Sequence, residues 1–139
     1  MATTVLLRLA ALTGDSRYRD AAERALAPIV GIAAQHPTGF SQWLQAHQMA
    51  NAPLVEVAIV GDPGADDTKT LLAVARKGRQ PGRVVASSAS PEASAVPLLH
   101  DRTAIDGAAT AYVCLGFACQ RPTSDPLELA RQLETASSS

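Results

Sequence analysis

The sequence has only two cysteines, Cys114 and Cys119, and no long hydrophobic run. Two cysteines are too few for a secreted scaffold held together by disulfides. No apolar run approaches the roughly 18 to 20 residues that a membrane-spanning helix needs. The N-terminal stretch MATTVLLRLAALTGD is interrupted by Arg8 and has no basic leader, so it predicts a helix rather than a signal peptide. We therefore expect a cytoplasmic protein with no membrane partner.

An excess of charge of either sign is also missing. The chain has 12 basic and 13 acidic residues, a formal net charge of −1. Proteins that bind nucleic acid or an anionic membrane carry a basic footprint, which this composition lacks. Nucleic acid is therefore not an expected partner.

Complete catalytic and cofactor motifs are lacking as well. Residues 61–67, GDPGADD, follow an expected strand and precede an expected helix, where doubly wound folds bind phosphate. The segment has neither the G-x-G-x-x-G fingerprint nor a Walker lysine. Its acidic residues Asp62, Asp66 and Asp67 would repel a phosphate, so we favour a plain turn with acidic capping. No nucleophile elbow or acid pair supports hydrolase chemistry, so no activity can be assigned to this chain alone. Since the phosphate-binding motifs are missing too, we expect no cofactor.

The first 50 residues of the 139-residue chain show the spacing of amphipathic helices. Helices are predicted over residues 3–12, over the segment after Ser16, and over 40–50. Gly14 suits the end of the first helix, and Asp15 or Ser16 can cap the second. Pro28 lies within the second helical pattern and predicts a kink or break, because proline cannot donate a backbone hydrogen bond.

From Pro53 onward strands alternate with helices. Strands are predicted over residues 54–60, 83–87 and 110–117, and helices over 67–78 and 125–136, with an irregular segment over 88–108. This order predicts a mixed α/β fold with a small three-stranded, mainly parallel sheet and flanking helices. We divide the chain into a helical hairpin segment, 1–52, and a small α/β subdomain, 53–139.

The helices of residues 1–50 cannot bury their apolar faces in a core of their own. Amphipathic helix pairs that need adjacent helix pairs to pack against are typical of toroids and solenoids. We therefore expect this chain to be part of a larger protein. Exposed apolar helix faces seek partners, so we predict self-association, or docking to the rest of the protein, through residues 1–50.

Three blocks of the sequence carry a family resemblance: LLRLAALTGDSRYRDAAERAL (6–26), VEVAIVGDP with DTKTLLA (55–63 and 67–73) and ATAYVCLGFACQRPTSDPLELARQL (109–133). Together they resemble the C-terminus of the thioredoxin-domain-containing, spermatogenesis-associated protein family and its bacterial relatives. The resemblance covers nearly the whole chain, and the last block is its most specific part.

The resemblance implies a longer protein with a thioredoxin-like domain at its N-terminus. An (α/α)₆ toroid similar to N-acylglucosamine 2-epimerases and six-hairpin glycosidases would follow that domain. Residues 1–50 would be the last hairpins of the toroid, and 54–139 an α/β appendage. The implied function of this chain is a non-catalytic structural or interaction module. The alternatives are a thiol-redox role and a part in a sugar-processing toroid.

Cys114 and Cys119 are the candidate thiol pair for the redox alternative. Their spacing is not Cys-x-x-Cys, and the first cysteine falls in a strand rather than at a helix start. We favour two thiols packed near the core. A disulfide remains possible if residues 115–118 make a tight turn. The chain lacks the short His or Cys pairings of a zinc site, so no metal is expected.

Phe40, Trp43 and His47 are the candidates for lining a sugar cavity. Aromatic side chains stack on sugars in toroid enzymes, but three such residues at helical spacing are more often a core stripe. Both interpretations stay open at this point.

Overall fold

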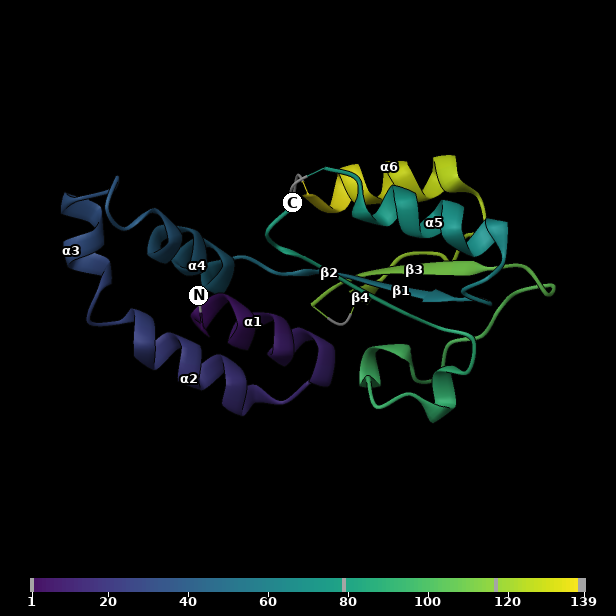
Figure 1. Cartoon of the computed structure of the whole chain (residues 1–139), viewed down its shortest axis with the longest axis horizontal. Coiled ribbons are helices and arrows are strands. Elements are labelled where there is room, and N and C mark those ends of the chain that lie inside the picture. The colour runs from purple at the N-terminus through teal and green to yellow at the C-terminus, as the bar shows by residue number, and fades with distance from the viewer. Residues whose placement is uncertain (1, 79, 117, 138–139) are drawn as a thin grey trace.

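The structure is a computed structural model, and it describes residues 2–78, 80–116 and 118–137. Four helices at the N-terminal end are followed by an α/β part (Figure 1). The mixed α/β class is confirmed. The helices are α1 (Ala2–Thr13), α2 (Ser16–Leu26), α3 (Val30–Gln35), α4 (Ser41–Asn51), α5 (Asp66–Arg76) and α6 (Pro126–Ser137). The strands are β1 (Val55–Val60), β2 (Arg83–Ser88), β3 (Thr110–Leu115) and β4 (Ala118–Cys119), and two short 3₁₀ helices are η1 (Pro91–Ala93) and η2 (Pro97–Leu99).

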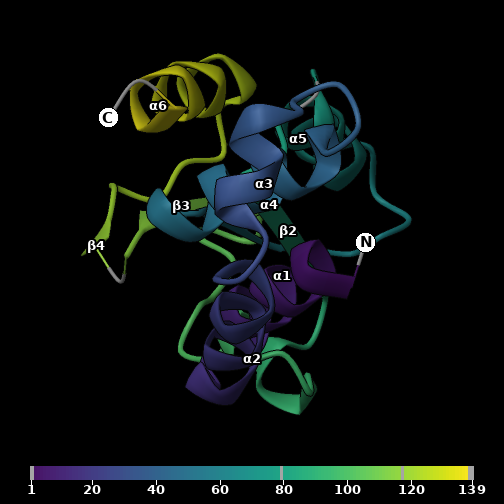
Figure 2. The ribbon, with the colours of Figure 1, turned by 90° about the vertical axis from the view of Figure 1, so that its left-hand side faces the viewer.

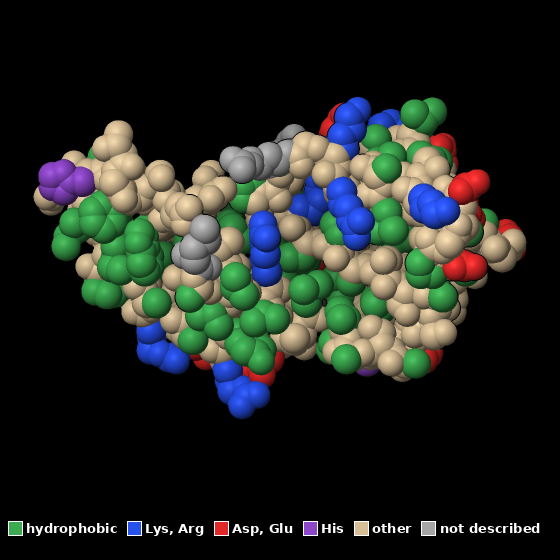
Figure 3. All heavy atoms as spheres, in the orientation of Figure 1, with side chains coloured by type: hydrophobic (Ala, Val, Ile, Leu, Met, Phe, Trp, Pro, Cys, Tyr) green, Lys and Arg blue, Asp and Glu red, His purple; other side chains and the backbone are tan. Residues whose placement is uncertain are grey.

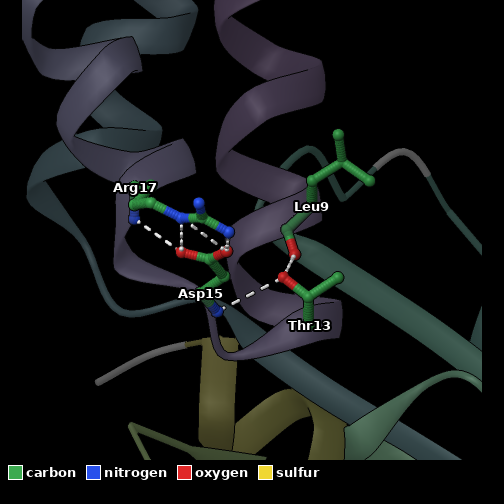
Figure 4. A network of polar contacts seen from close by, with 4 residues as sticks. All are labelled: Leu9, Thr13, Asp15 and Arg17. Atoms are coloured by element: carbon green, nitrogen blue, oxygen red, sulfur yellow. Dashed lines mark hydrogen bonds and ion pairs between the residues drawn. The ribbon is translucent and has the colours of Figure 1, made fainter.

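The turn between α1 and α2 is fixed by local polar contacts (Figure 4). Gly14 has a φ of +69°, the left-handed conformation in which glycine commonly ends a helix. Asp15 caps α2, because its Oδ1 accepts the backbone N–H of Arg17 at 3.0 Å, and the Arg17 guanidinium binds the same carboxylate at 2.7 Å. The Thr13 hydroxyl donates to the carbonyl of Leu9 at 2.7 Å. The first two predicted helices are thereby confirmed, with Asp15 as the cap of α2.

The second helical pattern is broken at Pro28, as expected. Helix α2 ends at Leu26 and α3 begins at Val30, so the proline lies in the turn between them. Helix α3 ends two residues before Pro37, and α4 follows over residues 41–51.

The four strands form one sheet in the order β2-β1-β3-β4. Strand β1 is parallel to β2, and α5 makes the crossover between them, but β3 is antiparallel to both β1 and β4. The expectation of a mainly parallel, three-stranded sheet is therefore wrong. Val60 pairs with both Ser88 and Thr110, so the chain leaves β2 and enters β3 at the same end of β1. A parallel β3 would need a crossover back along the sheet, usually a helix, and residues 89–109 contain only η1 and η2.

Helices α5 and α6 cover one face of the sheet and bury the main core (Figures 1 and 2). Strand β1 is buried on both faces except at Glu56, in keeping with its nearly continuous apolar sequence. The buried residues of this core are Val55, Val57, Ile59, Leu71, Ala75, Ala109, Ala111, Val113, Leu129, Leu133 and Ala136.

The other face of the sheet is covered by η2 and by the last turns of α1. Leu98 and Leu99 pack against Ala58 and Val84, and Ala11 and Leu12 of α1 join the same cluster. Helix α1 therefore ties the helical part to the sheet, while α2, α3 and α4 extend away from it (Figure 1).

The closing helix begins as the sequence predicts. The Asp125 carboxylate accepts the backbone N–H of Leu127 at 2.9 Å, and Pro126 is the first helical residue. The last predicted strand ends at Leu115, and its expected final residue, Phe117, lies outside the described residues. None of the helices in the described ranges is both long and apolar enough to cross a membrane.

Candidate functional site

The two cysteines form a disulfide across the β3–β4 hairpin. Leu115 pairs with Ala118 and Cys114 with Cys119, so the strands are joined by a two-residue loop. Gly116 opens this loop with a φ of +50°, the sign that tight hairpin turns require at that position. The hairpin register alone therefore brings the two cysteines face to face.

The position of this pair in the ladder also favours the bond. The N–H of Gln120 donates to the carbonyl of Val113 at 2.8 Å, which makes the adjoining Cys114–Cys119 pair a non-hydrogen-bonded one. Facing residues approach most closely at such positions. Of the alternatives that the sequence leaves open, the structure has the disulfide, and the favoured interpretation of two unbonded thiols is wrong.

The two ends of the disulfide differ in exposure. Cys114 is 1 % exposed, because β3 lies inside the sheet. Cys119 is exposed, because β4 is the edge strand and both of its residues face solvent. Cys119 is therefore the more solvent-accessible residue of the pair.

Arg102 lies directly against both sulfur atoms. Its Nη2 is 3.4 Å from Cys114 Sγ and 3.6 Å from Cys119 Sγ, and its Nη1 donates to the carbonyl of His100 at 3.2 Å. The guanidinium also lies over the ring of Tyr112, 5.6 Å from the centroid, a cation–π arrangement. These contacts fix a positive charge beside the disulfide.

Tyr112 holds the segment that carries Arg102. Its hydroxyl donates to the carbonyl of Thr103 at 2.7 Å and accepts the backbone N–H of the same residue at 3.2 Å. Tyr112 and Cys114 are two positions apart on β3, so they lie on the same face of the sheet. The arginine is therefore anchored to the strand that carries the buried cysteine.

Glu56 provides a negative group on the neighbouring strand. It pairs with Cys114 in the β1–β3 register. Burial raises the pKa of its carboxyl, and the nearby charge of Arg102 partly offsets that rise. Glu56 and Gly116 also line a cavity of about 280 Å³ between the sheet and the α1–α2 turn. The disulfide hairpin thus borders a small cleft with a carboxylate in its wall.

Phe40, Trp43 and His47 lie at the start and on one side of α4, and all three are half-buried. Helix α4 buries Ala46 and Met49 instead. The Asn51 side-chain amide lies 3.3 Å from the ring nitrogens of His47. None of the three residues lines the 280 Å³ cavity beside Glu56, and their role in a sugar cavity stays a prediction.

The acidic turn after β1 binds its own backbone. Asp62 accepts the N–H of Gly64 at 2.8 Å, and Asp67 accepts the N–H groups of Thr68 at 2.7 Å and Ala109 at 2.9 Å. Ala65 is the N-cap residue of α5 and has no side-chain cap, so of the two carboxylates expected at the start of this helix Asp67 alone is seen to bind backbone N–H groups, and it ties the turn to the start of β3. This arrangement has the chemistry of a structural turn.

Sequence reasoning missed Arg102, Tyr112 and Glu56 as partners of the cysteines. They come from three separate segments, and no local pattern links them. The signal for the disulfide itself was present: a glycine at the first position of a two-residue loop places residues 114 and 119 opposite each other.

Comparison with known proteins finds relatives that share one name. The chain is 29 % identical to spermatogenesis-associated protein 20 of Rattus norvegicus over 132 residues, and 29 % identical to the protein of that name from Homo sapiens. In each case the similarity covers 92 % of this chain. The chain resembles one segment of these proteins.

That segment is a small part of each relative. The chain spans 17 % of the length of the rat and human proteins. The Mus musculus protein of the same name is 27 % identical with the same coverage. No family model and no solved structure matches the chain.

Proposed function

We propose that this chain is the C-terminal structural and interaction module of a longer protein related to spermatogenesis-associated protein 20. In this proposal the chain has no catalytic activity of its own. Its α1–α4 part docks onto the portion of the longer protein that precedes it. The coverage of the relatives supports the proposal, because nearly all of this chain matches a sixth or so of each of them.

The observation that carries the proposal is the exposed apolar surface of the helical part. Val5 of α1 and Ile32 of α3 are 56 % and 54 % exposed. Apolar side chains gather on this part of the molecule in Figure 3. The buried cluster within the helical part is small, with Leu7 of α1, Ala22 of α2, Met49 of α4 and the following Leu54. Such a surface is stabilised by further helices packing on it.

A groove on the helical part supports a docking site there. Val5 and Leu44 line a hollow of about 1060 Å³ between α1, α4 and the segment after α5. Pro37 and Pro81 add apolar surface to its walls. We propose that a preceding helical hairpin occupies this groove in the longer protein, and that a second copy covers it when the chain is alone.

The test is the mass of the chain in solution by light scattering over a range of concentrations. Wild-type protein is expected to self-associate. Val5→Glu should weaken that association about tenfold or more, because it places a charge where a valine side chain would be buried. Leu127→Glu is the matched control, since Leu127 is 75 % exposed on α6, in the α/β part. A longer chain that includes the preceding helices should be monomeric.

A wild-type chain that stays monomeric at high concentration would contradict the proposal. Equal association of the Val5→Glu and Leu127→Glu variants would also contradict it.

A further inference from the structure

The disulfide has two features that a purely structural bond does not require. One sulfur belongs to an exposed residue and the other to a residue that is 1 % exposed. Arg102 touches both sulfur atoms through the same nitrogen, at 3.4 and 3.6 Å. Neither feature is used by the docking function proposed above.

The arginine suits the reduced state better than the oxidised one. A disulfide sulfur is neutral and a weak hydrogen-bond acceptor, whereas a thiolate carries a full negative charge. A neighbouring arginine is one of the environments that favour the thiolate form of cysteine. The Nε of Arg102 is buried and has no hydrogen-bond partner among the described residues, so the guanidinium has donor capacity in reserve.

We propose that Cys114–Cys119 is an exchangeable disulfide, which a dithiol reductant opens by attack on Cys119 and which releases Cys114 as a thiolate beside Arg102. The exposed residue receives the attack because the incoming sulfur must reach the disulfide from solvent. The buried residue is the leaving group, and the cation that stabilises it is already in contact with it.

The exchange takes place in two successive attacks. One thiolate of the dithiol bonds to Cys119 Sγ, the Cys114–Cys119 bond breaks, and its electron pair stays on Cys114 Sγ. The second thiol of the reductant loses its proton to solvent and attacks the reductant's own sulfur in the mixed disulfide. Cys119 leaves as a thiolate and takes up a proton from solvent. The reductant departs as a disulfide, and two electrons have passed to the protein.

The test uses the full oxidised chain with dithiothreitol as the dithiol, and acid quenching, alkylation and mass spectrometry as the readout. We expect reduction without denaturant. Glutathione, a monothiol that cannot complete the second step by itself, should leave a mixed disulfide on Cys119. A protein dithiol such as thioredoxin, compared at equal thiol concentration, shows whether a protein or a small molecule is the better reductant. Either order of rates supports the exchange.

Arg102→Gln should slow reduction by about threefold or more, because Cys114 becomes a poorer leaving group. Arg121→Gln is the matched control, since it removes an exposed positive charge two residues from Cys119 that has no contact with the sulfurs among those described. Arg102→Lys keeps the charge and should fall between the two rates. If circular dichroism shows that Arg102→Gln is not folded, the lysine variant and the position of the wild-type glutathione adduct decide.

Three results would overturn the proposal. They are a disulfide that resists dithiothreitol until the protein is denatured, a glutathione adduct on Cys114, and a folded arginine variant that is reduced as fast as wild type.

Discussion

At the scale of single residues, Gly61 shows how closely the end of β1 approaches its neighbours. A Cβ added there would lie 2.9 Å from Ala109 Cβ and would also meet the buried hydroxyl of Thr68. Real Cβ atoms do not approach other carbons so closely, so the α5 start or the β3 start would have to move. Gly61→Ala is expected to lower the free energy of unfolding by about 1 to 3 kcal/mol, measured by urea denaturation.

Gly31 is the control for that substitution. It lies in α3, an added Cβ would have no atom within 4 Å apart from its chain neighbours and its own helix backbone, and its φ is not positive. Gly31→Ala should leave stability unchanged or raise it by up to about 1 kcal/mol. Equal effects of the two substitutions would mean that Gly61 is not held by the contacts described.

The Asp67 carboxylate gives stability a pH dependence. Hydrogen bonds from the backbone of Ala109 and of Thr68 lower its pKa below the ordinary value of 3.8. A carboxylate with a lowered pKa contributes stability above its unfolded pKa and loses it as the pH falls through the folded one. Asp67→Asn should therefore be less stable than wild type at pH 7. The difference should shrink below about pH 4, as thermal melts at several pH values would show.

Asp66→Asn is the matched control for Asp67. The Asp66 side chain is fully exposed, and among the described residues its carboxylate has an ion pair with Lys69, at 3.5 Å, of the kind that contributes little. Its substitution should change stability little at either pH. An Asp67→Asn variant as stable as Asp66→Asn at pH 7 would show that the Ala109 contact does not stabilise the fold.

At the scale of elements, the β3–β4 hairpin is closed by a very short disulfide loop. The bonded cysteines are five positions apart, and by chain entropy a loop of that size contributes about 2 kcal/mol. We expect the fold to survive reduction, with the melting temperature lowered by roughly 5 to 10 °C. Circular dichroism melts with and without reductant measure this shift.

The double variant Cys114→Ala with Cys119→Ala is the control, because its melting temperature should not respond to reductant. Unfolding of the wild-type chain by reductant at room temperature would contradict the prediction, because it would mean that the fold requires the disulfide.

The same scale shows which elements the sequence could predict. Helix caps and breakers act locally, so Asp15, Asp125 and Pro28 mark their positions correctly. The β1–α5–β2 unit follows from the alternation of a strand, a helix and a strand. The direction of β3 depends on the end of the sheet at which the irregular segment 89–109 enters it, and no local sequence pattern predicts which end that is. Its lack of helical periodicity was nonetheless a signal against a parallel crossover.

At the scale of the whole molecule, the sequence could predict the cysteines of the site but not the arginine beside them. The cysteines stand out in any reading of the sequence, but Arg102 reaches them from a loop 12 and 17 positions away along the chain. Its placement depends on Tyr112 holding Thr103 and on the packing of η2 beneath the sheet. Contacts of this kind arise from the assembled fold, so residue spacing cannot show them.

The central position of β1 has a consequence for the order in which the protein is made. Val60 pairs with Thr110 and Val55 with Leu115, so the antiparallel partners are 50 to 60 residues apart. At about 5 to 20 residues per second, the ribosome delivers β3 roughly 3 to 12 seconds after β1. During that interval an almost wholly apolar strand, VEVAIV, has at least one open edge and no α6 above it. The nascent chain therefore passes through a stage at which this apolar strand lacks an edge partner and part of the cover that buries it in the folded protein.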